Sequence, residues 1–254
     1  MGEKTSKIRL WAVIFWLAVW QLAAMGLARA YPHGSLLLAS PAAVLYRLGQ
    51  LAVTAAFWQT VGWSAARIFG GFLLSTLLAV LLAALAAWKN GVGELLAPLV
   101  AVIKAVPVAS FIVIALLWLS SRRISAFIAF LMVLPVLYAN ALQGIREADP
   151  QLLEMARVFH VPFRRTLGGI WLPQVLPYFR AAVSLALGLC WKAGAAAEVI
   201  GLPSGTIGER LYTAKVYFQT PDLFAWTAVI VAVSVLFEKL FLALVDALAG
   251  KAGL

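Results

Sequence analysis

The sequence carries few side chains that could do chemistry. Its 254 residues include one cysteine, Cys190, and two histidines, His33 and His160, which are far apart in the chain. A nucleophilic enzyme needs an activating base beside its nucleophile, and a metal centre needs several convergent ligands. Cys190 lies in an apolar run with no evident base, and neither histidine lies in such a run. We therefore expect neither an enzyme nor a metal site.

Three side chains in apolar runs stand out as candidates for a translocation path. Trp191 and Glu198 are seven residues apart and share one face of a helix. Ionisable groups inside a membrane are costly and usually face protein or water, so both side chains could line the path or its gate. Alternatively, Glu198 pairs with Lys104 or Arg67 and fixes helix packing. Lys104, just before Pro107, could meet an anionic substrate or extend to the interface.

Composition places these residues in a membrane. Hydrophobic residues make up 64% of the chain and charged residues only 12%, whereas a soluble domain of this size carries far more charge. The sequence therefore predicts an all-α polytopic membrane protein. The net charge of +10 is accounted for by basic cytosolic loops beside anionic lipid, so no nucleic acid partner is expected.

The apolar runs predict about six membrane-spanning helices in a single domain, 1–254. Pro107 should kink or break the third span. Ser40 and Pro41 should begin an amphipathic helix at the outer interface, and the tail 238–254 should lie at the interface. The first run could instead be a signal peptide, although a retained span is favoured. The predicted segments are a leader at 1–9, spans at 10–27, 63–88, 95–120, 124–142, 174–200 and 221–237, and a core at 63–248.

Six spans place both termini on the same side of the membrane. Lysine and arginine are somewhat more frequent in the segments that share this side, which favours the cytosol. The same assignment places the polar loop 146–173 in the cytosol.

This loop contains a predicted short amphipathic helix. Asp149 can cap it, and Pro150 suits its first position, where no donor is needed. An apolar stripe follows at helical spacing, and such a stripe needs either the membrane interface or another protein to cover it. The stripe residues are Leu152, Met155, Ala156 and Phe159.

The loop also resembles a known motif. Glu154-Met155-Ala156, then His160, then Ile170-x-Leu172-Pro173 is similar to the EAA loop of permease subunits of bacterial binding-protein-dependent ABC importers. Met155 stands where that motif has alanine, and His160 where it has glycine. The glycine position ends the helix and can require a left-handed backbone, which histidine adopts more readily than most residues.

The resemblance extends over most of the chain. The segments SPAAVLYRL, SAARIFGGF, PVASFIVIALLW and WKAGAAAEVIG are similar to the nitrate/sulfonate/taurine branch of these permeases. It implies a type I importer permease fold in the bacterial plasma (inner) membrane. It also implies that the short helix docks on a cytosolic ATPase subunit and that the substrate is a small solute.

The resemblance further implies partners. Permeases of this kind work as pairs, with a homodimer as the simpler case, and receive solute from an extracytoplasmic binding protein. The chain has no G-x-x-x-x-G-K-[ST] motif, so ATP is expected on the separate ATPase and no cofactor in this chain. The competing interpretation is an ATP-independent channel or secondary transporter, although no repeat between the two halves supports it.

Overall fold

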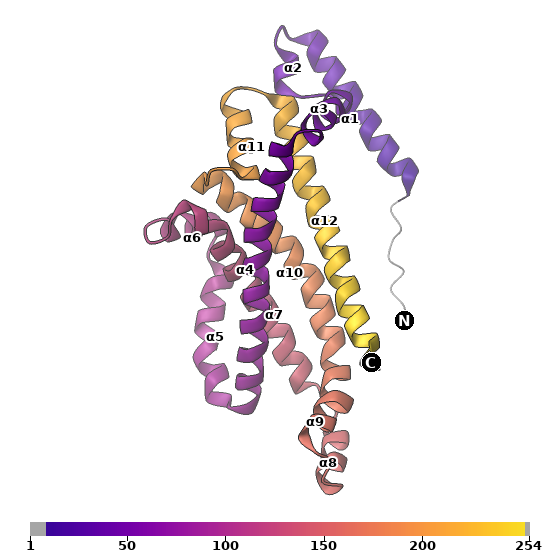
Figure 1. Ribbon diagram of the computed structural model, residues 1–254, viewed down its shortest axis with the longest axis vertical. Helices are drawn as coiled ribbons and strands as arrows, with labels where there is room; N and C mark the ends of the chain where they lie inside the picture. Colours follow the sequence, from indigo (N-terminus) through magenta and orange to yellow (C-terminus); the bar gives the residue numbers. More distant parts are fainter. Residues whose placement is uncertain (1–8, 252–254) are drawn as a thin grey trace.

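The computed structural model describes residues 9–251, and the ordered elements in that range are all helical (Figure 1). In chain order these are α1 (Leu10–Ala30), α2 (Gly34–Leu37), α3 (Pro41–Ala52), α4 (Ala55–Trp88), α5 (Asn90–Ala105), α6 (Val108–Ala115), α7 (Ser121–Arg146), α8 (Pro150–Val158), α9 (Phe163–Thr166), the π-helical segment η1 (Leu167–Trp171), α10 (Leu172–Gly201), α11 (Ile207–Val216) and α12 (Thr220–Lys251).

Five of these helical segments are long and apolar enough to cross a membrane: α1, α4, α7, α10 with the preceding α9 and η1, and α12. The sixth predicted span is the pair α5 and α6, whose axes differ by 103°. The break falls at Val106 and Pro107, as the sequence predicts, because proline has no N–H to continue the ladder of α5. Pro107 instead precedes α6 as its N-cap residue.

Several predicted boundaries were wrong. The second span begins at Ala55, not at residue 63, because Thr54 caps it by accepting a hydrogen bond from Phe57 N at 3.3 Å. Ser121, Arg122 and Arg123 fall between the spans predicted at 95–120 and 124–142, but they form the first turn of α7. The predicted leader, 1–9, lies outside the described residues except for its last residue. The helix predicted after Ser40 and Pro41 is confirmed as α3.

The last span differs most from its prediction. It was expected to end at residue 237, with a separate interfacial tail, yet α12 runs unbroken to Lys251. The charged residues Glu238 and Asp246, which follow the predicted end of the span, form hydrogen bonds with residues of α10. Glu238 accepts a hydrogen bond from Ser184, and Asp246 accepts two from Arg180, at 2.7 and 3.0 Å.

The centre of the protein is formed by α4, α7 and α10, with α12 packed along α10 (Figure 1). Gly71 allows α4 and α7 to approach closely, since a Cβ there would lie 2.2 Å from the carbonyl oxygen of Ala126. The adjacent Gly70 faces open space, so of the two glycines only Gly71 is needed for this approach.

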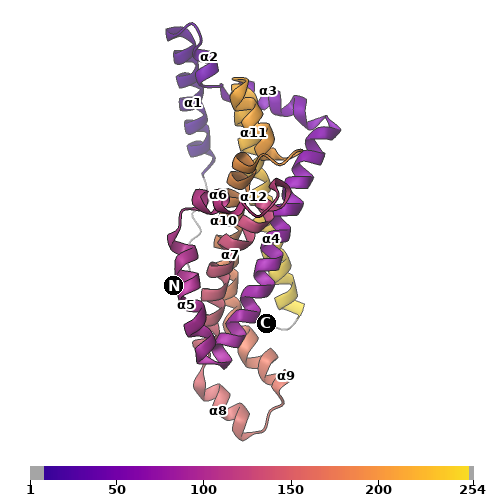
Figure 2. The same ribbon diagram turned by 90° about the vertical axis from the view of Figure 1, so that its left-hand side faces the viewer.

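The two ends of the molecule differ. The helices α8 and α9 form one tip, while α2, α3 and α11 lie at the opposite end (Figures 1 and 2). The helix α1 stands to one side and contacts α2 and α3. The loop that contains α8 leads into α10, and the buried Glu198 belongs to α10 itself, so one central helix connects the two.

Candidate functional site

The predicted short helix is present as α8. Asp149 caps it as predicted, since its Oδ1 accepts a hydrogen bond from Gln151 N at 2.8 Å, and Pro150 occupies the first turn. The backbone N–H of Asp149 also donates to Gln174 Oε1 at 2.7 Å. Because Gln174 belongs to α10, this bond ties the start of α8 directly to a central helix.

The predicted stripe divides into an inner edge and an exposed patch. Ala156 is only 4% exposed and packs inward, whereas Phe159 is 74% exposed. Two further exposed apolar residues were not predicted, since neither has a motif position: Val158 on α8 and Phe163 at the start of α9. We call the exposed set the α8 patch: Leu152, Met155, Val158, Phe159 and Phe163.

The end of α8 adopts the left-handed turn that its sequence predicts. His160 has φ of +50°. Its N–H donates to Arg157 O at 3.1 Å, and Val161 N donates to Ala156 O at 2.8 Å. These two bonds form a Schellman motif, which satisfies carbonyls that would otherwise be unpaired at the helix end. Histidine thus performs the conformational role that glycine has in the resembling motif.

The other motif residues hold the return of the loop. Ile170 is buried within η1, and Leu172 is exposed at the start of α10. Leu172 N donates to Leu167 O, the wide pairing of a π-helical turn, and Pro173 lies within the first turn of α10. Glu154 is exposed on α8 and makes no ion pair with any described residue. Its carboxylate is therefore available to a partner.

The Glu198 carboxylate lies at a buried junction of three helices. Its exposure is 0%, and its Oε2 accepts hydrogen bonds from Ser64 Oγ of α4 at 2.8 Å and from Gly208 N of α11 at 3.3 Å. The Ser64 hydroxyl in turn accepts from Ile207 N at 2.9 Å. A carboxylate beside the first N–H groups of a helix is electrostatically favourable.

The ion pair that the sequence left as one alternative for Glu198 is not formed among residues 9–251 in this conformation. Within residues 9–251, neither Lys104 nor Arg67 lies within ion-pair distance of it. Lys104 is exposed on α5, and the Arg67 guanidinium lies 6.0 Å from the centre of the Trp63 ring. A hydroxyl and a helix N-terminus take the place of the expected cation. Sequence reasoning missed Ser64, 134 residues from Glu198, and Gly208, 10 residues from it. Neither residue type indicates by itself that it would donate a hydrogen bond to this carboxylate.

Trp191 shares the buried face of α10 with Glu198. It is 2% exposed, and its ring packs 5.4 Å from that of Phe237 in α12. Both side chains therefore face packed helices in this conformation. Their part in a translocation path stays a prediction, as does that of Lys104.

Comparison with known proteins decides the family. Residues 75–252, more than half of the chain, match the family described as the binding-protein-dependent transport system inner membrane component. The chain belongs to this family. It is thus a permease of the ABC transporter class and a multi-pass membrane protein.

Curated relatives in this permease family are similar over most of the chain. One is the putative aliphatic sulfonates transport permease protein of Bacillus subtilis, 27% identical over 82% of this chain and 74% of that protein. Another is the bicarbonate transport system permease protein of Synechococcus elongatus, 26% identical over 72% of this chain and 66% of that protein.

The solved structures confirm the fold. A crystal structure of an amino acid ABC transporter with histidines matches at a TM-score of 0.60. The match covers 80% of this chain and 97% of that one at 15% identity. The permease fold predicted from the sequence is therefore confirmed.

Proposed function

We propose that this permease forms the membrane-spanning part of an ABC importer and that α8 docks on a separate ATPase subunit. The observation that carries the proposal is the α8 patch. Phe159 and Val158 are more than two-thirds exposed at the tip farthest from α11 (Figure 1). An exposed set of apolar residues on a short helix and the turn that follows it suits recognition in a groove of a partner protein.

The charged residues around the patch support the same partner. Arg157, Arg164 and Arg165 are exposed beside it, and Glu154 lies on the same helix. Charges at the rim of an apolar contact set partner choice and association rate more than affinity. We propose that they form ion pairs with the ATPase.

The connections of α8 would carry motion into the membrane helices. The Asp149–Gln174 hydrogen bond joins one end of α8 to α10, and the turn at His160 fixes the other end. Ile170 is buried where the chain returns to α10. A docked helix held at both ends moves with its neighbours, so closure of the ATPases would reach α10 without a flexible linker.

The remaining parts of the proposal concern assembly and cargo. We propose that a second copy completes the path, that an extracytoplasmic binding protein delivers the solute, and that both termini are cytosolic in the bacterial inner membrane. The relatives named for aliphatic sulfonates and for bicarbonate support a small anion as the solute. ATP would be bound by the ATPase, with no cofactor in this chain.

For the buried residues we propose a division of roles. Glu198 holds α11 against α4 and α10, since its hydrogen bonds join all three. Trp191 fixes the spacing of α10 and α12. Lys104, exposed beside the α5–α6 break, remains the candidate that could meet an anionic solute in the assembled path.

The test of the docking proposal is Met155→Glu, with Met155→Leu as its matched control. Both replacements favour helix, so α8 should persist, but only the first places a charge in the patch. In vesicles containing the permease, its ATPase and its binding protein, Met155→Glu should lower ATP-driven uptake at least about tenfold. Met155→Leu should stay within about twofold of wild type. Equal uptake by both variants would show that the patch is not the ATPase contact.

A further inference from the structure

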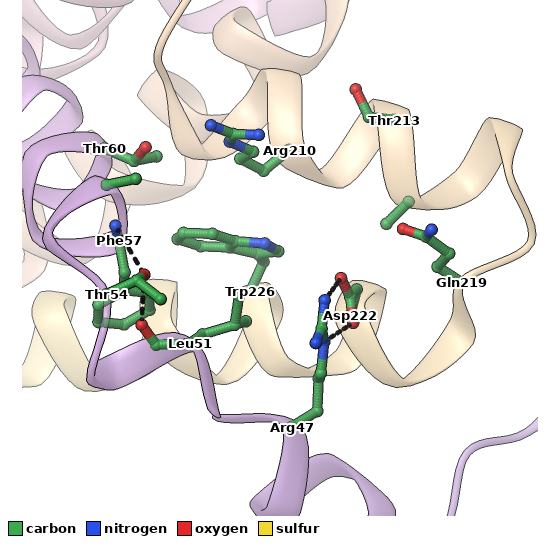
Figure 3. A pocket seen from close by; sticks show the side chains of 12 residues that line it. Arg47, Leu51, Thr54, Phe57, Thr60, Arg210, Thr213, Gln219, Asp222 and Trp226 are labelled. Carbon is green, nitrogen blue, oxygen red and sulfur yellow. Dashed lines mark hydrogen bonds and ion pairs between the residues drawn. The ribbon is translucent and has the colours of Figure 1, made fainter. Parts of the chain in front are cut away.

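A cavity of about 260 Å³ lies among α3, α4, α11 and α12 (Figure 3), at the end of the protein opposite α8 (Figure 1). It is separate from the α8 patch and from the Glu198 junction. Ligand cavities for drug-sized molecules measure roughly 300–1,000 Å³, so this one suits a smaller molecule or a headgroup. Leu51, Phe57 and the Trp226 ring supply its apolar lining.

Two charged residues of the cavity lining, Arg47 and Asp222, pair with each other. Arg47 donates two hydrogen bonds to the Asp222 carboxylate, one of them from Nη2 at 3.0 Å, and its Nη1 donates to Gln50 at 3.0 Å. The hydrogen bonds to Asp222 raise the pKa of the Arg47 guanidinium above its ordinary value. The pair is therefore charge-neutral and closes one side of the cavity.

Arg210 is the third charged residue of the described lining, beside the Arg47–Asp222 pair. Its guanidinium points into the cavity above Trp226 (Figure 3), and it makes no ion pair or side-chain hydrogen bond with any residue in 9–251. Thr60 is 3% exposed and also lines the cavity, so its hydroxyl adds a buried polar group. Thr213 and Gln219 add further polar side chains to the lining.

Among the described lining residues, the charge that no ion pair neutralises is the positive one of Arg210, and the hydroxyl and amide groups beside it can donate hydrogen bonds. Guanidinium groups bind carboxylate and phosphate through paired hydrogen bonds. We propose that this cavity binds a small oxyanion group, such as a phosphate, sulfonate or carboxylate, with Arg210 as its charged ligand and Thr60 as a buried hydroxyl ligand. The group could belong to a free anion or to a lipid headgroup.

The experiment compares Arg210→Gln with Lys215→Gln in the full-length protein. Lys215 is exposed on the same helix but does not line the cavity, so it controls for the loss of one positive charge. The free-anion arm measures the rise of the unfolding midpoint when inorganic phosphate replaces chloride at equal ionic strength. The lipid arm measures retention of phosphatidylglycerol by native mass spectrometry.

We expect Arg210→Gln to lower the apparent affinity for at least one probe by about tenfold or more, while Lys215→Gln stays within about twofold. Thr60→Val should weaken the same probe without changing the charge. An effect on phosphate alone identifies a free anion, and an effect on phosphatidylglycerol alone identifies a headgroup. Wild-type protein that binds neither probe, or equal binding by the two charge variants, would overturn the proposal.

Discussion

Removing the Glu198 carboxylate would leave the Ser64 hydroxyl and the Gly208 N–H buried without their acceptor. Each unpaired buried group costs about 1–3 kcal/mol, so Glu198→Ala should lower the free energy of unfolding by a few kcal/mol. Glu198→Gln keeps an acceptor oxygen and should fold and assemble. Thermal unfolding and size-exclusion chromatography of both variants measure this difference.

The uptake activity of folded Glu198→Gln then separates the two roles considered for this residue. Impaired uptake by an intact assembly would support a place in the translocation path. Unimpaired uptake by that assembly would support the packing role alone. A Glu198→Ala variant as stable as wild type would contradict the junction described for α4, α10 and α11.

His160 allows a second prediction at the scale of single residues. A left-handed backbone costs a side-chain-bearing residue roughly 1–2 kcal/mol, a cost that glycine avoids. His160→Gly should therefore leave ATP-driven uptake intact or raise it. His160→Val should lower both uptake and the unfolding midpoint, because β-branched residues tolerate this conformation worst. Equal uptake by the two variants would show that the Schellman turn is not needed for coupling.

At the scale of elements, the glycine pair in α4 offers a matched comparison. A Cβ at Gly71 would lie 2.2 Å from a backbone oxygen of α7, whereas one at Gly70 meets nothing within 4 Å. Gly71→Ala should thus cost about 1–3 kcal/mol through overpacking. Gly70→Ala should be neutral or stabilising by up to about 1 kcal/mol, because alanine favours helix. Unfolding midpoints in detergent would test this, and identical midpoints would contradict the close α4–α7 contact.

Elements whose signals are local could be predicted from the sequence. The break at Pro107, the cap at Asp149 and the left-handed turn at His160 each depend on one residue and its neighbours. The length of α12 could not be predicted in this way. Its charged residues, Glu238 and Asp246, read as the end of a span until their distant partners in α10 are known.

The candidate site likewise has features that local sequence predicts and features that depend on distant residues. The spacing of the α8 residues follows from helical geometry, so the stripe was predictable, but the burial of Ala156 depends on how the loop folds back. The partners of Glu198 lie on α4 and α11, 134 and 10 residues away. No pattern along the chain indicates that a serine so far away in sequence donates a hydrogen bond to Glu198, where a cation was considered.

At the scale of the whole molecule, the two ends of the permease carry surfaces of different chemistry. The α8 patch is apolar with a basic rim, and the cavity beside Arg210 is polar with one uncommitted charge. The central helices connect them, and the Glu198 junction lies on the α11 side of this connection. This arrangement fits a subunit that receives energy at one end and solute at the other.

The central claim is that uptake through this permease is driven by ATP hydrolysis on a separate subunit. The direct measurement is solute uptake by sealed vesicles containing the permease, its co-purified ATPase and the binding protein, with and without ATP. We expect uptake only with ATP, and none when the ATPase is omitted. Uptake driven by an ion gradient alone, at the same rate without ATP or the ATPase, would contradict the account and favour a secondary transporter.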